Sequence, residues 1–144
     1  TNPGLIPRFI DESLRLESPA QGLYRRCTRD VTIGGTTIPA GAIVLLMFAA
    51  GNRDERQFPN SAQLDLERPN AQRHLAFGHG IHSCIGRTLA TAELTIAVTR
   101  LLERLDNIRL HPDAAPMRYK PHFNMRALES LDIVFDTRSL APNR

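Results

Sequence analysis

The chain has 144 residues, 42% of them hydrophobic, which is enough to bury one sizeable core, so a single domain is the default expectation. Its formal net charge of +3 comes from many arginines and one lysine, Lys120. No basic run or basic–aromatic alternation accompanies that charge, which argues against a nucleic-acid binder. The two cysteines, Cys27 and Cys84, form no CxxC pair, which argues against a disulfide scaffold or structural zinc site and favours a reducing compartment.

No targeting or membrane segment is recognisable. Residues 1–22 hold no basic segment followed by an apolar core, so no secretory signal is indicated. The longest apolar run, residues 42–50, is too short to span a bilayer. We therefore expect a cytoplasmic protein whose partners include neither a membrane nor a nucleic acid.

The first predicted element is a helix over residues 5–17. Its apolar stripe has helical spacing, and Pro19 ends the pattern. The stripe consists of Ile6, Phe9, Ile10 and Leu14. Glu12 and Arg15 lie three positions apart and therefore project from the same face. On its own such a pair is most simply a surface ion pair, contributing about 0.3–0.5 kcal/mol.

The middle of the chain is predicted to consist of short strands and irregular segments. Residues 16–24 connect the helix to extended structure. Two β-branched runs around Gly34-Gly35 predict a β-hairpin over residues 31–38. Residues 42–48 are predicted to be a buried strand or helix, which periodicity does not distinguish. Residues 58–73 contain two prolines and little regular pattern.

The clearest helix in the sequence begins with Arg87. Its apolar stripe is predicted to pack in the core and comprises Ala90, Leu94, Ala97, Val98, Leu101, Leu102 and Leu105. Residues 108–110 and 131–135 are predicted to be short strands, joined by a loop rich in proline, histidine and aspartate. His111 and His122 in that loop have no partner at metal-ligand spacing, so we interpret them as solvated.

One stretch before that helix carries most of the chemistry, namely Phe77-Gly78-His79-Gly80-Ile81-His82-Ser83-Cys84-Ile85-Gly86. Glycine lets the backbone approach a flat or bulky group that a side chain would block. A helix N-terminus stabilises an anion, so a cysteine there favours its thiolate. This arrangement predicts a thiolate site for a soft metal centre, which we interpret as a heme iron. The simpler alternative is a small buried cysteine beside a glycine turn.

The pattern Phe77-x-x-Gly80-x-His82-x-Cys84-x-Gly86 resembles, at every position, the heme-binding signature of the cytochromes P-450, the heme-thiolate monooxygenases. The resemblance implies that Cys84 is the axial ligand to the iron of heme b (iron protoporphyrin IX) and favours O–O cleavage by electron donation. It also implies that Phe77 shields the sulfur, Gly86 lets the next helix pass close to the porphyrin, and His82 hydrogen-bonds a propionate. Further heme-binding candidates are Gly78, Gly80 and His74.

Other motifs extend the resemblance along the chain. Arg25 resembles the arginine that pairs with a heme propionate, and Arg26 is the alternative, because strand alternation lets only one of them face the heme. Glu12-Ser13-Leu14-Arg15 resembles the ExxR motif of the family's helix K. Arg68 matches the third member of the buried network that this motif forms, and we interpret Glu12, Arg15 and Arg68 as structural.

The resemblance also implies where substrate would be contacted. Residues 19–23 follow helix K past the heme edge, and residues 121–128 resemble the family's last substrate-contact turn. Ala127 stands where glycine is usual in that turn, so its conformation is expected to differ slightly. The candidates for lining the pocket are Phe123, Asn124 and Met125.

The implied fold is α+β and covers essentially the whole chain: helix K, small β-sheets, an irregular meander, the cysteine-ligand loop, helix L and a terminal β-hairpin. Residues 1–144 are expected to be the C-terminal, heme-binding part of a cytochrome P-450 domain of the soluble bacterial type. Nothing in them matches the oxygen-activating helix of the N-terminal part. The implied activity is insertion of one oxygen atom from O₂ into an organic substrate. The alternatives are a truncated heme-binding module without oxygenase activity and a remnant that binds no heme alone.

The implied partners are the remaining N-terminal part of the same fold, a small organic substrate, and a ferredoxin- or flavodoxin-type redox protein. Arg73 and Arg87 lie near Cys84 in the sequence. They are candidates for a basic face that docks an acidic redox partner.

Overall fold

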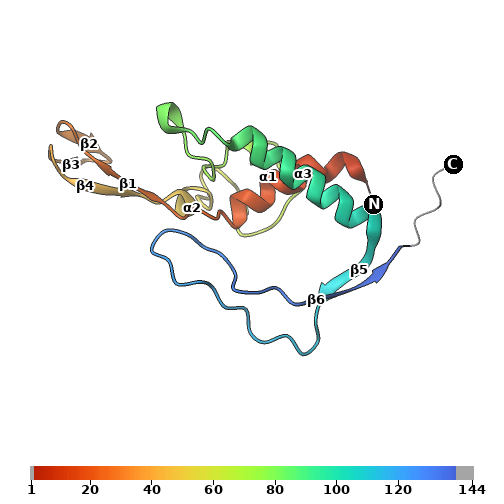
Figure 1. Ribbon diagram of the computed structural model, residues 1–144. Coiled ribbons are helices and arrows are strands. Elements are labelled where there is room, and N and C mark those ends of the chain that lie inside the picture. The colour runs from red at the N-terminus through yellow and green to blue at the C-terminus, as the bar shows by residue number, and fades with distance from the viewer. Residues whose placement is uncertain (1, 139–144) are drawn as a thin grey trace.

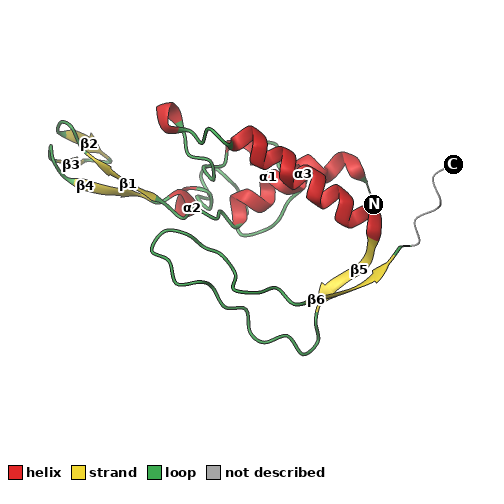
Figure 2. Cartoon of the chain, viewed as in Figure 1, coloured by secondary structure: helices red, strands yellow, loops and turns green. Residues whose placement is uncertain are grey.

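The computed structural model describes residues 2–138, in which the helices lie at the centre and short β-ribbons extend from them (Figures 1 and 2). The helical elements are η1 (Pro3–Leu5), α1 (Ile6–Leu16), α2 (Phe48–Gly51), η2 (Ala71–Arg73), η3 (Gly80–His82) and α3 (Arg87–Arg104). The strands are β1 (Leu23–Arg26), β2 (Val31–Ile33), β3 (Thr36–Ile38), β4 (Ile43–Leu46), β5 (Leu105–Leu110) and β6 (Ile133–Thr137).

Helix α1 forms where the sequence predicts a helix, but half of its buried face is charged. The helix ends at Leu16, after which the Glu17 N–H still donates to the Ser13 carbonyl at 2.8 Å. Its buried residues are Ile6, Ile10, Glu12 and Arg15. Two apolar and two ionic side chains therefore point into the molecule together.

The described strands form three two-stranded antiparallel ribbons. β1 pairs with β4, β2 with β3, and β5 with β6, the last pair joined across a long loop. The β2–β3 turn confirms the predicted hairpin: Gly34 and Gly35 take φ values of +56° and +79°, which a tight two-residue turn requires. In Figure 1 the β1–β4 and β2–β3 ribbons extend together as an arm away from α1 and α3.

Two predictions of burial are wrong. The segment over residues 42–48 is a strand, β4, running into α2; only its last residue, Phe48, is buried, and Ile43, Leu45 and Leu46 are exposed. The reason is that no helix or sheet covers the β1–β4 ribbon within residues 2–138. Helix α3 covers the predicted stripe except Leu105, which begins β5, yet none of its residues is buried, and Leu101 of the stripe is 49% exposed. It packs beside α1 on one side, and the rest of its apolar stripe has no cover in the described part of the chain.

The buried centre is small and rich in polar groups. Its apolar members are Ile6, Ile10, Phe48, Phe58 and Ala71, and its polar members are Glu12, Arg15, Ser18, Asn52, Ser61, Arg68 and His74. They come from α1 and the residues just after it, from α2 and its C-terminal cap, and from residues 58–74. The irregular course of residues 58–73 was predicted, and only η2 is regular there. Within residues 2–138, no helix combines the length and the apolar character that crossing a membrane requires.

Candidate functional site

The loop before α3 is folded by its glycines and by its own backbone. Gly78 and Gly80 have φ values of +68° and +75°, a left-handed backbone conformation that residues with a Cβ rarely adopt. The Cys84 N–H donates to the Phe77 carbonyl at 2.8 Å, which closes the loop, and the Arg87 N–H donates to the Cys84 carbonyl at 3.3 Å. Cys84 therefore lies immediately before the N-terminal end of α3.

This loop forms one wall of a cavity of about 590 Å³, and β1, β4 and the start of α2 form the other. The side chains that carry polar groups into the lining are Arg25, His79, His82 and Cys84. The apolar part of the lining includes Leu23, Leu46, Met47, Phe48, Leu75 and Phe77. Residues distant in the sequence are thus brought together around one mostly apolar space.

The groups in this lining fit a flat apolar ring that carries an iron and carboxylate arms. A thiolate is a soft ligand for heme iron. Guanidinium and imidazole N–H groups pair with carboxylates, and apolar walls accept the ring. Arg25 lies on the half-buried side of β1 and lines the cavity, whereas Arg26 lies on the exposed side of the strand.

The other heme-binding candidates occupy different positions. Gly78 lies in the lining, whereas Gly80, Gly86 and His74 do not. A Cβ added to Gly86 would lie 3.8 Å from the Cys84 sulfur, so this glycine is a direct neighbour of the thiol. His74 is buried behind the loop, where its ring lies 5.8 Å from that of Phe77.

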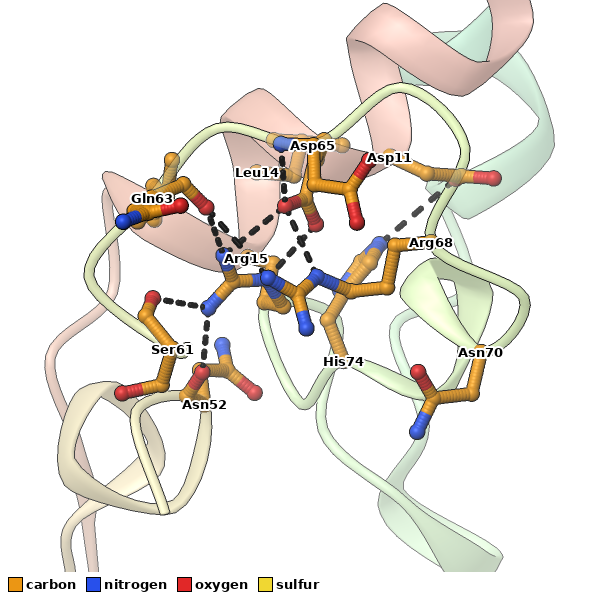
Figure 3. Close-up of polar contacts among 12 residues, drawn as sticks. Asp11, Leu14, Arg15, Asn52, Ser61, Gln63, Asp65, Arg68, Asn70 and His74 are labelled. Carbon is orange, nitrogen blue, oxygen red and sulfur yellow. Dashed lines mark hydrogen bonds and ion pairs between the residues drawn. The ribbon is translucent and has the colours of Figure 1, made fainter. Parts of the chain in front are cut away.

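The predicted network of Glu12, Arg15 and Arg68 is a buried cluster (Figure 3). Arg15 binds Glu12 in a bidentate manner, with Nε–Oε2 and Nη2–Oε1 distances of 2.6 and 2.9 Å, and Arg68 Nε donates to Oε1 at 2.9 Å. The Asp65 N–H adds a bond of 3.0 Å to the same oxygen. Backbone carbonyls of residues 52, 59–61 and 63 accept the remaining guanidinium N–H groups.

These contacts keep the Glu12 carboxylate ionised. Burial alone would raise its pKa, but the hydrogen bonds from Arg15, Arg68 and the Asp65 N–H outweigh burial and lower the pKa from 4.5 to about 2. The cluster ties α1 to residues 52–68, which precede η2 and the cysteine loop in the chain.

The three substrate-contact candidates lie on a turn that pairs with the segment after α1. The Gln21 N–H donates to the Asn124 carbonyl at 2.7 Å, and Ala20 forms a β-bridge with Met125. Phe123 is 78% exposed, and its ring stacks on that of Tyr24 at 6.3 Å. Met125 lines a second cavity of about 440 Å³, shared with Ala20, Phe77 and the apolar stripe of α3.

Two polar groups near the loop carried no signal in the sequence, the buried Asn52 and the partly exposed Asp11. Asn52 donates from Nδ2 to Ser18 Oγ at 2.7 Å, and its Oδ1 accepts the Leu75 N–H at 2.6 Å. Asp11 lies 3.7 Å from His74, measured from Oδ1 to Nε2. A lone asparagine in a loop and an aspartate on a helix match no motif, so these positions were not predicted.

Comparison with known proteins identifies the family. A family model described as Cytochrome P450 matches residues 4–130. The chain belongs to the cytochrome P450 family. The resemblance carried by the Phe77–Gly86 motif is thereby confirmed.

The cytochrome P450 relatives are bacterial and considerably longer. The chain is 46% identical over 119 residues to 20-oxo-5-O-mycaminosyltylactone 23-monooxygenase of Streptomyces fradiae, covering 83% of this chain and 28% of that protein. It is 51% identical over 104 residues to cytochrome P450 130 of Mycobacterium tuberculosis, covering 72% of this chain and 25% of that protein. The chain spans about a third or less of the length of the curated relatives it matches.

Solved cytochrome P450 structures confirm the α+β fold. Mycobacterium marinum CYP150A6 in its substrate-free form matches with a TM-score of 0.90 and 37% identity, over 96% of this chain and 36% of that one. P450BioI, in complex with an acyl carrier protein ligated by hexadec-9Z-enoic acid, matches with a TM-score of 0.87 and 42% identity, over 94% of this chain and 34% of that one.

Proposed function

We propose that residues 1–144 form the C-terminal, heme-binding part of a cytochrome P450 monooxygenase. Cys84 ligates the iron of heme b through its thiolate, and His82 and Arg25 bind the propionates. The observation that supports this assignment is that these three side chains line one cavity with mostly apolar walls, together with Phe77. Family membership supports the heme-thiolate chemistry.

When bound, the heme supplies the redox chemistry that activates O₂. The residues of this chain hold the ring and set its electronic environment. The Cys84 thiolate donates electron density, and the N-terminal end of α3, which follows it, favours negative charge at that point. The overall reaction inserts one oxygen atom into a small organic substrate and reduces the other to water.

The substrate wall contributed by this chain is the paired turn that carries Phe123, Asn124 and Met125. Its hydrogen bonds to residues 19–22 fix it beside the loop, since the Arg126 N–H also donates to the Pro19 carbonyl at 2.7 Å. Phe123 and Met125 offer aromatic and flexible apolar contacts, which suit an organic substrate.

A further part of the same fold completes this site. The accessible surface of the chain is 10826 Å², whereas a compact monomer of its mass, 16.1 kDa, has about 7,400 Å². Exposed apolar side chains lie on α3 and β4, among them Ile96 on α3 and Leu45 on β4. An N-terminal part that carries the oxygen-activating helix would cover these faces and close the heme pocket.

Electrons reach the site from a ferredoxin- or flavodoxin-type protein. Arg73 and Arg87 are exposed on either side of the loop and offer positive charge to an acidic partner. Cys27 and Cys84 are both free thiols, which supports a reducing compartment and hence the cytoplasm.

A carbon monoxide difference spectrum tests the proposal. The full-length protein that carries this chain is reconstituted with heme, reduced and treated with carbon monoxide. We expect the red-shifted Soret band of thiolate ligation, and we expect Cys84→Ser to abolish it. Cys27→Ser is the matched control, because it removes the only other thiol of residues 1–144, and Cys27 lies outside the cavity lining.

Four results would contradict the proposal in whole or in part. A wild-type protein without the red-shifted band would exclude thiolate ligation, and a Cys84→Ser variant that keeps the band would exclude Cys84. Equally tight heme binding by residues 1–144 alone would contradict the need for a further part of the fold. Heme binding in the full-length protein without oxygenation of any substrate would favour the heme-binding module instead.

A further inference from the structure

His74 is a fully buried ring next to the cysteine loop, with no role assigned by the heme site. The exposed fraction of its side chain is 0%. Its Nδ1 accepts the Ala76 N–H at 3.1 Å, so this nitrogen carries no proton. The proton of the neutral ring therefore lies on Nε2. The backbone bond thus selects one tautomer of His74.

The Nε2 atom faces α1. It is buried without a hydrogen-bond partner among the described residues, and the nearest acceptor is Asp11 Oδ1 at 3.7 Å, joined to it by a dashed line in Figure 3. Burial lowers the pKa of His74; Asp11 raises it, and Arg87 on α3 and Arg15 on α1 lower it. The ring is therefore neutral near pH 7, as the tautomer requires.

Two contacts lead from this ring to the cysteine. The first is the Ala76 N–H, which fixes the backbone one residue before Phe77. The second is the Phe77 ring itself, which lies 5.8 Å from His74 and 5.6 Å from the Arg87 guanidinium. The carbonyl of Phe77 accepts the Cys84 N–H. A displacement of His74 would therefore move the group that holds Cys84.

We propose that His74 is a positioning residue for Cys84. It holds Ala76 through Nδ1, directs its Nε2–H at Asp11, and so fixes the segment whose carbonyl binds the cysteine. Like the outer groups that orient a metal ligand, it acts without touching the metal. The expected effect of His74 on heme ligation rests on the proposed function, whereas its expected effect on the conformation of the loop does not.

Amide hydrogen exchange of the heme-free, full-length protein tests the loop. In His74→Phe, which keeps a ring but has no acceptor, exchange at Ala76 and at Cys84 should rise about five- to tenfold. In His74→Asn, whose Oδ1 stands near the position of Nδ1, both amides should stay near the wild-type rate. His74→Gln, which places no acceptor there, should behave as His74→Phe and serves if the latter does not fold.

The chain offers a matched control in a second histidine with the same local bond. His111 Nδ1 accepts the Asp113 N–H, also at 3.1 Å, in an exposed loop. His111→Phe should speed exchange at Asp113 and leave Ala76 and Cys84 unchanged. Unchanged exchange at Ala76 in both His74→Phe and His74→Gln would overturn the proposal. Faster exchange at Ala76 with no change at Cys84 would overturn the positioning role.

Loading with iron protoporphyrin IX supplies the second readout. In His74→Phe, part of the red-shifted carbon monoxide band should be replaced by the band of a heme without thiolate. In His74→Asn, the red-shifted band should remain as in the wild type. Identical spectra for wild type and both variants would overturn the effect on the ligand. If the wild type itself lacks the red-shifted band, the proposed function fails, while the heme-free exchange still decides whether His74 positions Cys84.

Discussion

The Glu12 carboxylate is the residue on which the buried centre depends most. It is the only acid that contacts the two buried guanidinium groups of Arg15 and Arg68 among the described ion pairs. Removing its charge leaves both cations buried without a counter-ion. We expect Glu12→Gln to lower the free energy of unfolding by about 3–5 kcal/mol, measured by urea denaturation. The control is Glu67→Gln, which removes an ion pair to Arg8 that is largely exposed and should cost about 0–1 kcal/mol.

The pH dependence of stability follows from the same carboxylate. Its pKa is about 2 in the folded chain and 4.5 ordinarily, so between these values the unfolded chain binds more protons. Stability from Glu12 is therefore fully present above about pH 4.5 and is lost as the pH falls towards 2. The urea midpoint of the wild type should fall over this range more steeply than that of Glu12→Gln. Parallel curves, or equal losses in Glu12→Gln and Glu67→Gln, would show that the cluster does not stabilise the fold.

At the scale of elements, the β1–β4 ribbon depends on a close approach at Gly22. A methyl group added to this residue would lie 2.5 Å from the Leu46 carbonyl oxygen. This oxygen belongs to the backbone, so it cannot move away by a change of side-chain rotamer. We expect Gly22→Ala to destabilise the protein by about 1–3 kcal/mol in thermal or urea unfolding. Gly51→Ala is the control, because its methyl would meet only the end of the flexible Leu75 side chain, at 3.1 Å. An equal effect of the two changes would contradict this account.

The sequence predicted those elements whose cause is local. Apolar periodicity predicted α1 and α3, and the two glycines with their β-branched neighbours predicted the β2–β3 hairpin. Burial was predicted less well, because whether the stripe of α3 is covered depends on which element lies against it. Periodicity states that a face is apolar and does not say what covers it.

In the candidate site too, residues marked by a local motif were predicted, whereas contacts between distant segments were not. The cysteine motif marked Cys84 and His82, and strand alternation left Arg25 and Arg26 open until the structure placed Arg25 in the cavity lining. His74 was predicted as a heme-binding residue, yet it lies behind the lining. Its neighbour Asp11 was not predicted, because their proximity arises from the docking of α1 on η2 rather than from any motif.

At the scale of the whole molecule, the proposed docking of a redox partner at Arg73 and Arg87 is tested by reversing their charge. If Arg73 and Arg87 dock an acidic redox protein, the double variant Arg73→Glu/Arg87→Glu should be reduced about tenfold more slowly at low salt, with a weaker dependence on ionic strength. The measurement is the rate of heme reduction by a ferredoxin- or flavodoxin-type donor. Arg29→Glu, in the exposed segment between β1 and β2, should leave the rate unchanged. Wild-type kinetics in the double variant across ionic strengths would remove this docking face.

The polar character of the buried centre has a consequence for heating. The hydration of ions becomes less favourable as temperature rises, so burying Glu12, Arg15 and Arg68 costs less in a hot solution than in a cold one. Burial of apolar surface makes the free energy of unfolding curve with temperature. Few apolar side chains are buried in the described part of this chain, so this contribution is small here. The junction between α1 and the segment leading to Cys84 is therefore held by contacts that strengthen with warming, so this junction should be among the last parts of the chain to melt.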